Sequence, residues 1–326
     1  MKTFYKIAIV LLISYSTFSC KKELAPLSVA PKKATLSSSS TYGQVTTVAT
    51  GIQAGGLAVD AAHNLYASTG NGPIIYKITP AGTVTPFADL GPEGYTRGIT
   101  FGPDSALYVT NLATNNVIEK ITLKGVVTLF CGLPGDHFRP PKDGPLAQAI
   151  FYNPQFITSC ADGNLYVTED GLAWETPYTD IRVITPGTDG IVYTLYARDN
   201  SPAFQPWSIA MHQGIVYFSD FNSGEIAKIA LDGTVSTFVT GIGQSWGIVF
   251  DPAGNLYVSD LVNNKIMKVT PDGVVSTLAG SGAIGSSDGI GANATFYAPA
   301  GLVIDGDYLY VGDTGTNDLI RKISLK

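Results

Sequence analysis

The sequence has little charge, few histidines and few cysteines, and each shortage argues against a class of structure or function. Only 14% of its 326 residues are charged, which argues against a disordered chain or one built from solvated helices. Its three histidines, His63, His137 and His212, are scattered, so no cluster offers the three or four ligands that zinc needs. No phosphate-binding loop of the GxxxxGK(S/T) type and no Cys–His pair is evident. The sequence therefore contains no recognisable catalytic set.

Positive charge is also scarce once the N-terminus is set aside. The net charge is −6, and the first 41 residues contain six lysines against one glutamate. The remaining body therefore carries about −11. A surface of that sign repels phosphate backbones, so we expect no nucleic-acid partner.

The N-terminus has the features of an export signal. The apolar run Ile7–Ile13 is too short to span a bilayer and follows two lysines. Small residues then precede a cysteine in Thr17–Cys20, which resembles the cleavage box of bacterial lipoproteins. That resemblance implies that residues 1–19 are a signal peptide and that Cys20 becomes lipidated. The alternative is an ordinary signal peptide with an incidental cysteine.

Residues 20–41 continue as a polar segment rich in Pro, Ser, Ala and Lys. Such a composition cannot bury a core, so we expect a flexible tether. Together, the two N-terminal segments predict an exported protein that an N-terminal lipid attaches to the membrane. The expected location is the bacterial cell envelope, in the outer membrane.

Glycine and tyrosine, by contrast, are abundant, and the body repeats one pattern six times. In the copy at 247–279, turn residues separate four short alternating segments, as in a sheet of four antiparallel strands. The second segment of every copy carries a tyrosine: Tyr66, Tyr108, Tyr166, Tyr217, Tyr257 and Tyr310.

The sixth copy lacks a fourth strand, and a matching segment lies at the other end of the body. Val45–Ala49 reads VTTVA and resembles Val235–Val239, which reads VSTFV. If this N-terminal strand completes the last blade, the sheets close into a ring. The sequence therefore predicts an all-β, six-bladed β-propeller with four-stranded antiparallel blades over residues 42–326.

The repeats resemble those of the NHL family, which is related to the gluconolactonase-like propellers. The resemblance rests on Gly247–Ile248, Asn255–Asp260 and Asn263–Ile266. Two long loops, from Asp143 to Pro154 and from Asp288 to Pro299, add a DG…A…F…P pattern typical of NHL proteins. Because this superfamily includes binding modules, lactonases and lyases, the resemblance implies the fold and leaves the function open.

Two cysteines lie in the body. The repeat alignment places Cys131 at the end of an outer strand and Cys160 in the turn after an inner strand. A disulfide needs Cα atoms about 5.5 Å apart, and these positions are not expected to approach so closely. We therefore expect two thiols.

The long connections are expected on a single face of the ring. The insertion at 170–179 and the loops that lead into the inner strands share that face: 89–97, 132–155, 198–206, 241–246 and 280–300. Long loops on a rigid scaffold favour a binding role. The alternative is that they shield strand edges.

The residues that open the inner strands should surround the axis on that face. They are Arg97, Gln155, Gln205, Trp207, Gln244 and Trp246. Indole rings stack on sugars or aromatic groups, while amides and arginine bind hydroxyls or carboxylates. These residues are the predicted ligand-binding site. Packing of the tryptophans between blades is the alternative.

A carboxylate ends the second strand in four adjacent blades, at Glu169, Asp220, Asp260 and Asp313. In one interpretation, Glu169, Asp220 and Asp260 help to hold Ca²⁺ or another divalent cation. In the other, each carboxylate caps the turn that follows it, which the regular recurrence favours.

The leading hypothesis is a non-catalytic binding module at the cell envelope. It would recognise a glycan, a peptide or an envelope protein through the long-loop face. The alternative is a divalent-metal-dependent lactonase, hydrolase or lyase of the gluconolactonase-like type. The sequence assigns no catalytic residue.

Overall fold

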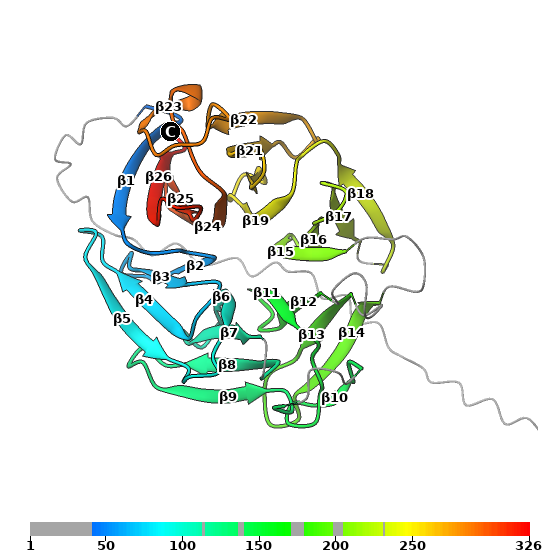
Figure 1. Cartoon of the computed structure of the whole chain (residues 1–326). Helices are drawn as coiled ribbons and strands as arrows, with labels where there is room; N and C mark the ends of the chain where they lie inside the picture. The colour runs from blue at the N-terminus through cyan, green and yellow to red at the C-terminus, as the bar shows by residue number, and fades with distance from the viewer. Residues whose placement is uncertain (1–40, 113–114, 136–139, 171–178, 198–204, 231) are drawn as a thin grey trace, which may run out of the picture.

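The computed structural model describes residues 41–326 except 113–114, 136–139, 171–178, 198–204 and 231. The predicted signal peptide, Cys20 and the tether up to residue 40 lie outside the described residues, as does His137. Six antiparallel sheets stand around a common axis as the blades of a propeller (Figure 1). In the parts of the chain that the structure describes, no helix is long and apolar enough to cross a membrane.

Consecutive strands of each blade pair antiparallel from the axis outward, which confirms the predicted fold. The innermost strands of blades 1 to 6 are β2 (Gly56–Val59), β6 (Thr96–Phe101), β11 (Pro154–Ser159), β15 (Pro206–His212), β19 (Ser245–Phe250) and β24 (Pro299–Asp305). The second strands are β3 (Leu65–Ser68), β7 (Leu107–Asn111), β12 (Leu165–Glu169), β16 (Ile215–Asp220), β20 (Leu256–Asp260) and β25 (Tyr308–Asp313). The third strands are β4 (Ile74–Ile78), β8 (Val117–Ile121), β13 (Asp180–Ile184), β17 (Ile226–Ile229), β21 (Lys265–Val269) and β26 (Leu319–Ser324). The fourth strands are β5 (Val84–Asp89), β9 (Val127–Cys131), β14 (Ile191–Ala197), β18 (Val235–Val239), β22 (Val275–Ala279) and, for blade 6, β1 (Gln44–Thr50).

The ring closes as the sequence predicts. Strand β1 pairs antiparallel with β26, and Val45 lies opposite Ile323. Val45 is fully buried in a hydrophobic cluster that joins blades 5 and 6. The closing strand therefore contributes both hydrogen bonds and apolar packing to the last blade.

Neighbouring blades are joined by hydroxyl groups near the ends of the second strands. In five blades, the hydroxyl of a Ser or Thr donates to a backbone carbonyl in the inner strand of the next blade. The donors are Ser68, Thr110, Thr168, Ser219 and Ser259. Glycines on the inner strands allow this close approach. A Cβ on Gly247, for example, would lie 2.5 Å from the Ala300 carbonyl oxygen.

The two DG…A…F…P loops differ from our expectation that every long loop lies on one face. Each runs along the outside of a blade and adds a fifth strand of two residues. Strand β10 (Gly144–Pro145) pairs with β14, and β23 (Gly289–Ile290) pairs with β1. A short 3₁₀ helix, η1 (Gly291–Asn293), follows β23. Blades 3 and 6 are therefore five-stranded, because these loops cover strand edges that would otherwise be exposed.

Buried side chains hold these loops in place. Phe151 is buried at the interface of blades 2 and 3. The guanidinium of Arg182, on β13, donates to Glu169 at 3.0 Å and to Asp143 of the loop at 2.8 Å. The same arrangement recurs around Arg321 in blade 6, half a ring away. The loop motif is thus a structural element that locks the blade edge.

The two body cysteines agree with the sequence prediction. Cys131 is buried in the cluster that joins blades 2 and 3, and Cys160 lies half-buried in the turn after β11. In the described chain they are not joined by a disulfide.

The two faces of the ring differ in what they carry. We call the side on which the inner strands begin the loop face. The opposite side is the terminal face, because Gly43 and Ser324 meet there through a backbone hydrogen bond of 2.8 Å. Thr41, the first described residue, therefore lies at the terminal face.

Candidate functional site

Four of the six predicted ligand-binding residues converge at the axis on the loop face. Arg97, Gln155, Trp207 and Trp246 each stand at the second position of an inner strand, in blades 2, 3, 4 and 5. Because the blades repeat in register, this position points toward the same end of the axis in each of them. These four side chains therefore lie together, and their role in binding a ligand stays a prediction.

The Arg97 guanidinium is the centre of the group. It lies 5.0 Å from the ring centroid of Trp207 and 5.2 Å from that of Trp246. The two indoles meet edge to face, with centroids 5.2 Å apart. On its remaining side, Arg97 donates a hydrogen bond to the Gln155 side-chain oxygen. The cation is thus held by two aromatic faces and an amide.

Burial lowers the pKa of Arg97, and the nearby Tyr95 phenol and Asp170 carboxylate oppose that shift. Among the described residues, no carboxylate forms an ion pair with Arg97. The guanidinium therefore remains able to bind an anionic or acceptor group.

Two buried donors in this group have no acceptor. Arg97 Nε and Trp207 Nε1 lack a hydrogen-bond partner among the described residues, whereas Trp246 Nε1 donates to the Gly55 carbonyl at 3.1 Å. Trp207 is 8% exposed. An unpartnered buried donor costs free energy, so a ligand acceptor placed here would be stabilised.

The other two predicted residues have different roles. Gln205 is buried and donates to Asp170 at 2.5 Å, while its side-chain oxygen accepts from Asn222. It thus adjoins the Arg97 group through Asp170. Gln244 is half-buried at the start of blade 5, and its backbone carbonyl accepts from Leu261. No described contact joins the Gln244 side chain to the Arg97 group.

The structure also adds aromatic residues that the sequence analysis did not select. Phe221 stacks on Trp207 with centroids 4.5 Å apart. Phe156 lies against both tryptophans, at 6.3 Å and 6.2 Å. The inner strands of blades 2 and 5 carry Gly98 and Gly247 at the position of Phe156. That break in the repeat was a signal available from the sequence.

The predicted metal ligands are engaged in other contacts. Glu169 accepts from the Tyr152 backbone N–H at 2.8 Å and from Arg182. Burial raises its pKa to about 7, an effect that Arg182 opposes. Glu169 thus orders a loop and balances a buried arginine.

The other two carboxylates cap turns. Asp220 accepts backbone N–H bonds from Gln205, Asn222 and Ser223 at 2.8–3.1 Å. Asp260 likewise accepts from the backbone of Asn263 at 3.1 Å. Within the described ranges, no three His, Cys, Asp or Glu side chains gather where they could hold a metal ion. The donor set does not fit a divalent-cation site, and the contacts are those of the structural interpretation.

No protein-family model matches the chain, and no curated protein matches it. Solved structures match over most of both chains. A gluconolactonase from Xanthomonas campestris is 17% identical with a TM-score of 0.65, covering 86% of this chain and 89% of its own. Virginiamycin B lyase from Staphylococcus aureus, solved with quinupristin, is 20% identical with a TM-score of 0.57, covering 85% and 82%. An auxiliary nutrient-binding protein from Bacteroides thetaiotaomicron is 18% identical with a TM-score of 0.65, covering 86% and 76%. At these identities, the likeness shows the propeller fold alone.

Proposed function

We propose that this protein is a lipid-anchored binding module of the bacterial cell envelope, with NHL-type repeats. It recognises a glycan, a peptide or an envelope protein through the loop face. The observation that carries the proposal is the Arg97 guanidinium between Trp207 and Trp246, beside two buried donors that have no partner among the described residues. Such a group suits a ligand that presents a flat face together with a carboxylate or another strong acceptor.

The position of the chain ends supports this arrangement. A tether over residues 20–41 would join the propeller on the terminal face, where Gly43 lies. A lipid on Cys20 would then hold that face toward the membrane and turn the loop face away from it. The Arg97 group would thus be presented to soluble or surface-bound ligands.

The comparisons are compatible with a binding role. The fold is shared with a nutrient-binding protein as well as with lactonases and lyases. A metal-dependent lactonase or lyase would need Glu169, Asp220 and Asp260 as ligands, and each of these already serves an arginine or a turn. The Arg97 group requires no metal to bind an acceptor, so the non-catalytic hypothesis explains more of the geometry.

The test is binding of residues 41–326, which contain every strand of the ring, to glycan and peptide arrays followed by calorimetry. We expect hits enriched in uronic acids or free C-terminal carboxylates. Arg97→Gln should weaken binding by about tenfold or more, because a charge-assisted hydrogen bond is lost. Lys124→Gln, on an exposed turn of the terminal face, is the matched control and should leave the affinity unchanged.

Two results would contradict the proposal. One is equal binding by Arg97→Gln and the control for every hit. The other is turnover of a lactone or ester that depends on Arg97, Trp207 or Trp246, which would make this site catalytic.

A further inference from the structure

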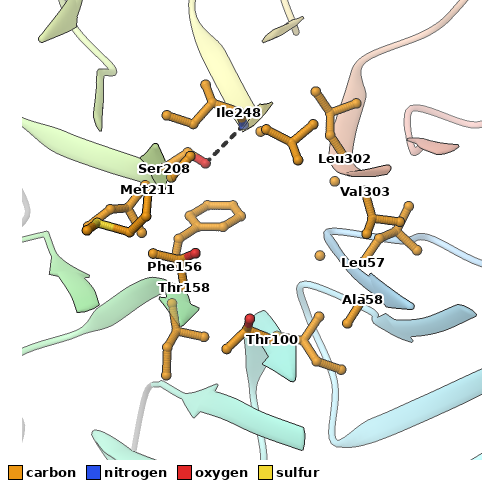
Figure 2. A pocket seen from close by; sticks show the side chains of 18 of the residues that line it. Leu57, Ala58, Thr100, Phe156, Thr158, Ser208, Met211, Ile248, Leu302 and Val303 are labelled. Atoms are coloured by element: carbon orange, nitrogen blue, oxygen red, sulfur yellow. Dashed lines mark hydrogen bonds between the residues drawn. The ribbon is translucent and has the colours of Figure 1, made fainter. Parts of the chain in front are cut away.

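The outer rim of the propeller is less regular than its axis. The inner strands of all six blades line a single channel on the axis (Figure 2), as in propellers generally. At the rim, by contrast, blades 3 and 6 carry a fifth strand, and the described parts of the other four blades have none. A partner that binds at the rim can therefore distinguish one blade from the next.

The fifth strands of blades 3 and 6 are held at one register position. In blade 3, Arg182 lies opposite Thr194 of the outer strand. Asp143, which immediately precedes the fifth strand, accepts from the Arg182 guanidinium at 2.8 Å and from the backbone N–H of Thr194 at 3.1 Å. Blade 6 repeats both contacts. An extended segment thus docks on a blade edge where its charge complements the third strand at this position.

Blade 2 has the opposite charge at this position and no fifth strand. Glu119 of β8 lies opposite Leu129 of β9, as Arg182 lies opposite Thr194. Where blades 3 and 6 end their second strands with an acid, blade 2 has Asn111, whose amide donates to Glu119 Oε1 at 3.1 Å. The arginine and its acid are thus replaced by an acid and a neutral amide.

Glu119 uses only part of its capacity for hydrogen bonds. Its Oε2 is buried and has no hydrogen-bond partner among the described residues. Lys120, the next residue in the chain, pairs with Asp104 instead. Burial raises the pKa of Glu119, and the hydrogen bond from Asn111 opposes that shift. A buried carboxylate oxygen without a donor costs free energy, and a lysine or arginine that reached Oε2 would remove this cost.

The edge of β9 is open to such a segment. In the described chain, β9 pairs with β8 alone. Val126, just before β9, is 54% exposed, and Leu129 is 52% exposed. The other outer strands mostly carry a threonine at the register position of Leu129: Thr47, Thr194, Thr237 and Thr277. An open strand edge with exposed aliphatic side chains favours the addition of a strand.

We propose that the outer edge of blade 2 binds an extended, basic segment of a partner protein as a fifth strand. The segment runs antiparallel to β9, its lysine or arginine bonds Glu119, and its backbone covers Leu129. The residue after that cation lies opposite Val127, as Gly144 lies opposite Val192 in blade 3. This surface is on the rim and does not depend on the Arg97 group.

The experiment uses residues 41–326, after cooperative thermal unfolding has shown that each preparation is folded. The probe is a fluorescently labelled peptide of residues 141–150, from the loop that docks on blade 3, with Asp143→Lys. The controls are the unchanged peptide and a scrambled peptide with the composition of the probe. In about 0.15 M salt, which screens the net charge of the protein, fluorescence anisotropy should show saturable binding of the probe. Both controls should bind on the order of tenfold more weakly.

One change in the protein and one in the peptide locate the cation. Glu119→Gln keeps the size of the side chain and should weaken binding of the probe on the order of tenfold. A peptide with norleucine in place of the added lysine should bind Glu119→Gln and the wild type equally. This double-mutant comparison isolates the contact between Glu119 and the lysine.

Leu129→Pro tests the strand edge. Proline has no N–H to donate, and blade 1 already carries Pro86 at this register position, so the fold should tolerate it. Thr277→Pro makes the same change at the same position of blade 5 and should bind the probe like the wild type. If Leu129→Pro does not fold, Leu129→Thr replaces it. That variant introduces the residue common at this position and should weaken the probe severalfold, because the aliphatic contact is lost.

Any of four results overturns the proposal. The wild type shows no saturable binding of the probe, or the scrambled peptide binds as tightly as the probe. Either Glu119→Gln or the Leu129 variant binds the probe like Thr277→Pro. In the fourth, sedimentation shows a dimer that Leu129→Pro abolishes, which would assign the edge to a second copy of this chain.

Discussion

Replacing Arg321 by leucine probes the buried clamp that holds the second DG loop. Arg321 is fully buried and donates to Asp313 at 3.0 Å and to Asp288 at 2.8 Å. It also donates to the backbone carbonyls of Thr295 and Ser287, each at 3.0 Å. The loop, the second strand and the third strand of blade 6 are thus tied to one side chain.

The expected loss can be estimated from these contacts. Leucine removes the guanidinium and leaves Asp313, which is fully buried, with its N–H donors from Tyr297 and Asn317 only. Breaking a buried ion pair on one side costs about 3–5 kcal/mol. In a domain of this length, a loss of about 1 kcal/mol lowers Tm by roughly 2 °C, so we expect a drop of about 6–10 °C.

The pH dependence gives a sharper test than the size of the loss. Burial raises the pKa of Asp313, and Arg321 is among the groups that oppose this shift. Without Arg321 the folded-state pKa rises further, so the folded variant favours the protonated acid. Its stability deficit should therefore be smaller near pH 4 than at pH 7 and should grow as the pH rises between these values.

Chemical denaturation at pH 4, 5.5 and 7 measures this deficit. Arg182→Leu should behave alike, because Arg182 makes the matching contacts in blade 3. Lys326→Leu is the control, since its ion pair with Asp307 is exposed and should contribute little. A deficit that does not change with pH, or a control that loses as much as Arg321→Leu, would refute the reasoning.

Three further predictions follow from the same structure. Thr168→Val should lower the free energy of unfolding by about 1–3 kcal/mol in a denaturant titration, because the buried Trp207 carbonyl loses the hydrogen bond that Thr168 donates at 2.5 Å. Unchanged stability would contradict the role of the interblade hydroxyls. Burial raises the pKa of Cys131 to about 12, so iodoacetamide at pH 8 should alkylate Cys160 and spare Cys131 until the protein unfolds, and peptide mass spectrometry decides this. Calcium titration of the wild type should give no binding heat, and Asp220→Ala should lower Tm through its lost turn contacts; tight calcium binding that this substitution abolishes would instead identify Asp220 as a metal ligand.

The fold was predictable because each repeat contains its own turn and strand signals. The tyrosine of the second strand marked the blades, and Val45–Ala49 identified the strand that closes the ring. The path of the DG loops was not predictable from spacing alone. The path depends on the hydrogen bond that the buried Arg182 donates to Asp143, which lies 39 residues earlier in the chain. A pair so far apart in the chain leaves no local pattern in a single sequence.

The positions of the candidate site residues were predictable as far as the repeat itself was. Register placed Arg97, Gln155, Trp207 and Trp246 around one end of the axis, since position along an inner strand fixes position around the ring. Register says nothing about what a side chain contacts once it is there. The engagement of Gln205 with Asp170 therefore emerged only from the structure.

The places where the repeat is broken indicate where selection has acted on more than the scaffold. Four of the other five inner strands carry glycine at this level, and blade 4 carries Ser208. The backbones approach closely there, since a Cβ on Gly98 would lie only 2.7 Å from the Ile157 nitrogen. Blade 3 has Phe156 there instead. The bulky side chains around it all come from blades 2 to 5, while blades 6 and 1 present Ala300 and Gly55. A scaffold optimised for symmetry alone has no use for such an imbalance, and departures from local rules concentrate at functional sites. Trp246 uses the room that the small residues leave, because its indole reaches from blade 5 to the Gly55 carbonyl of blade 1 at 3.1 Å.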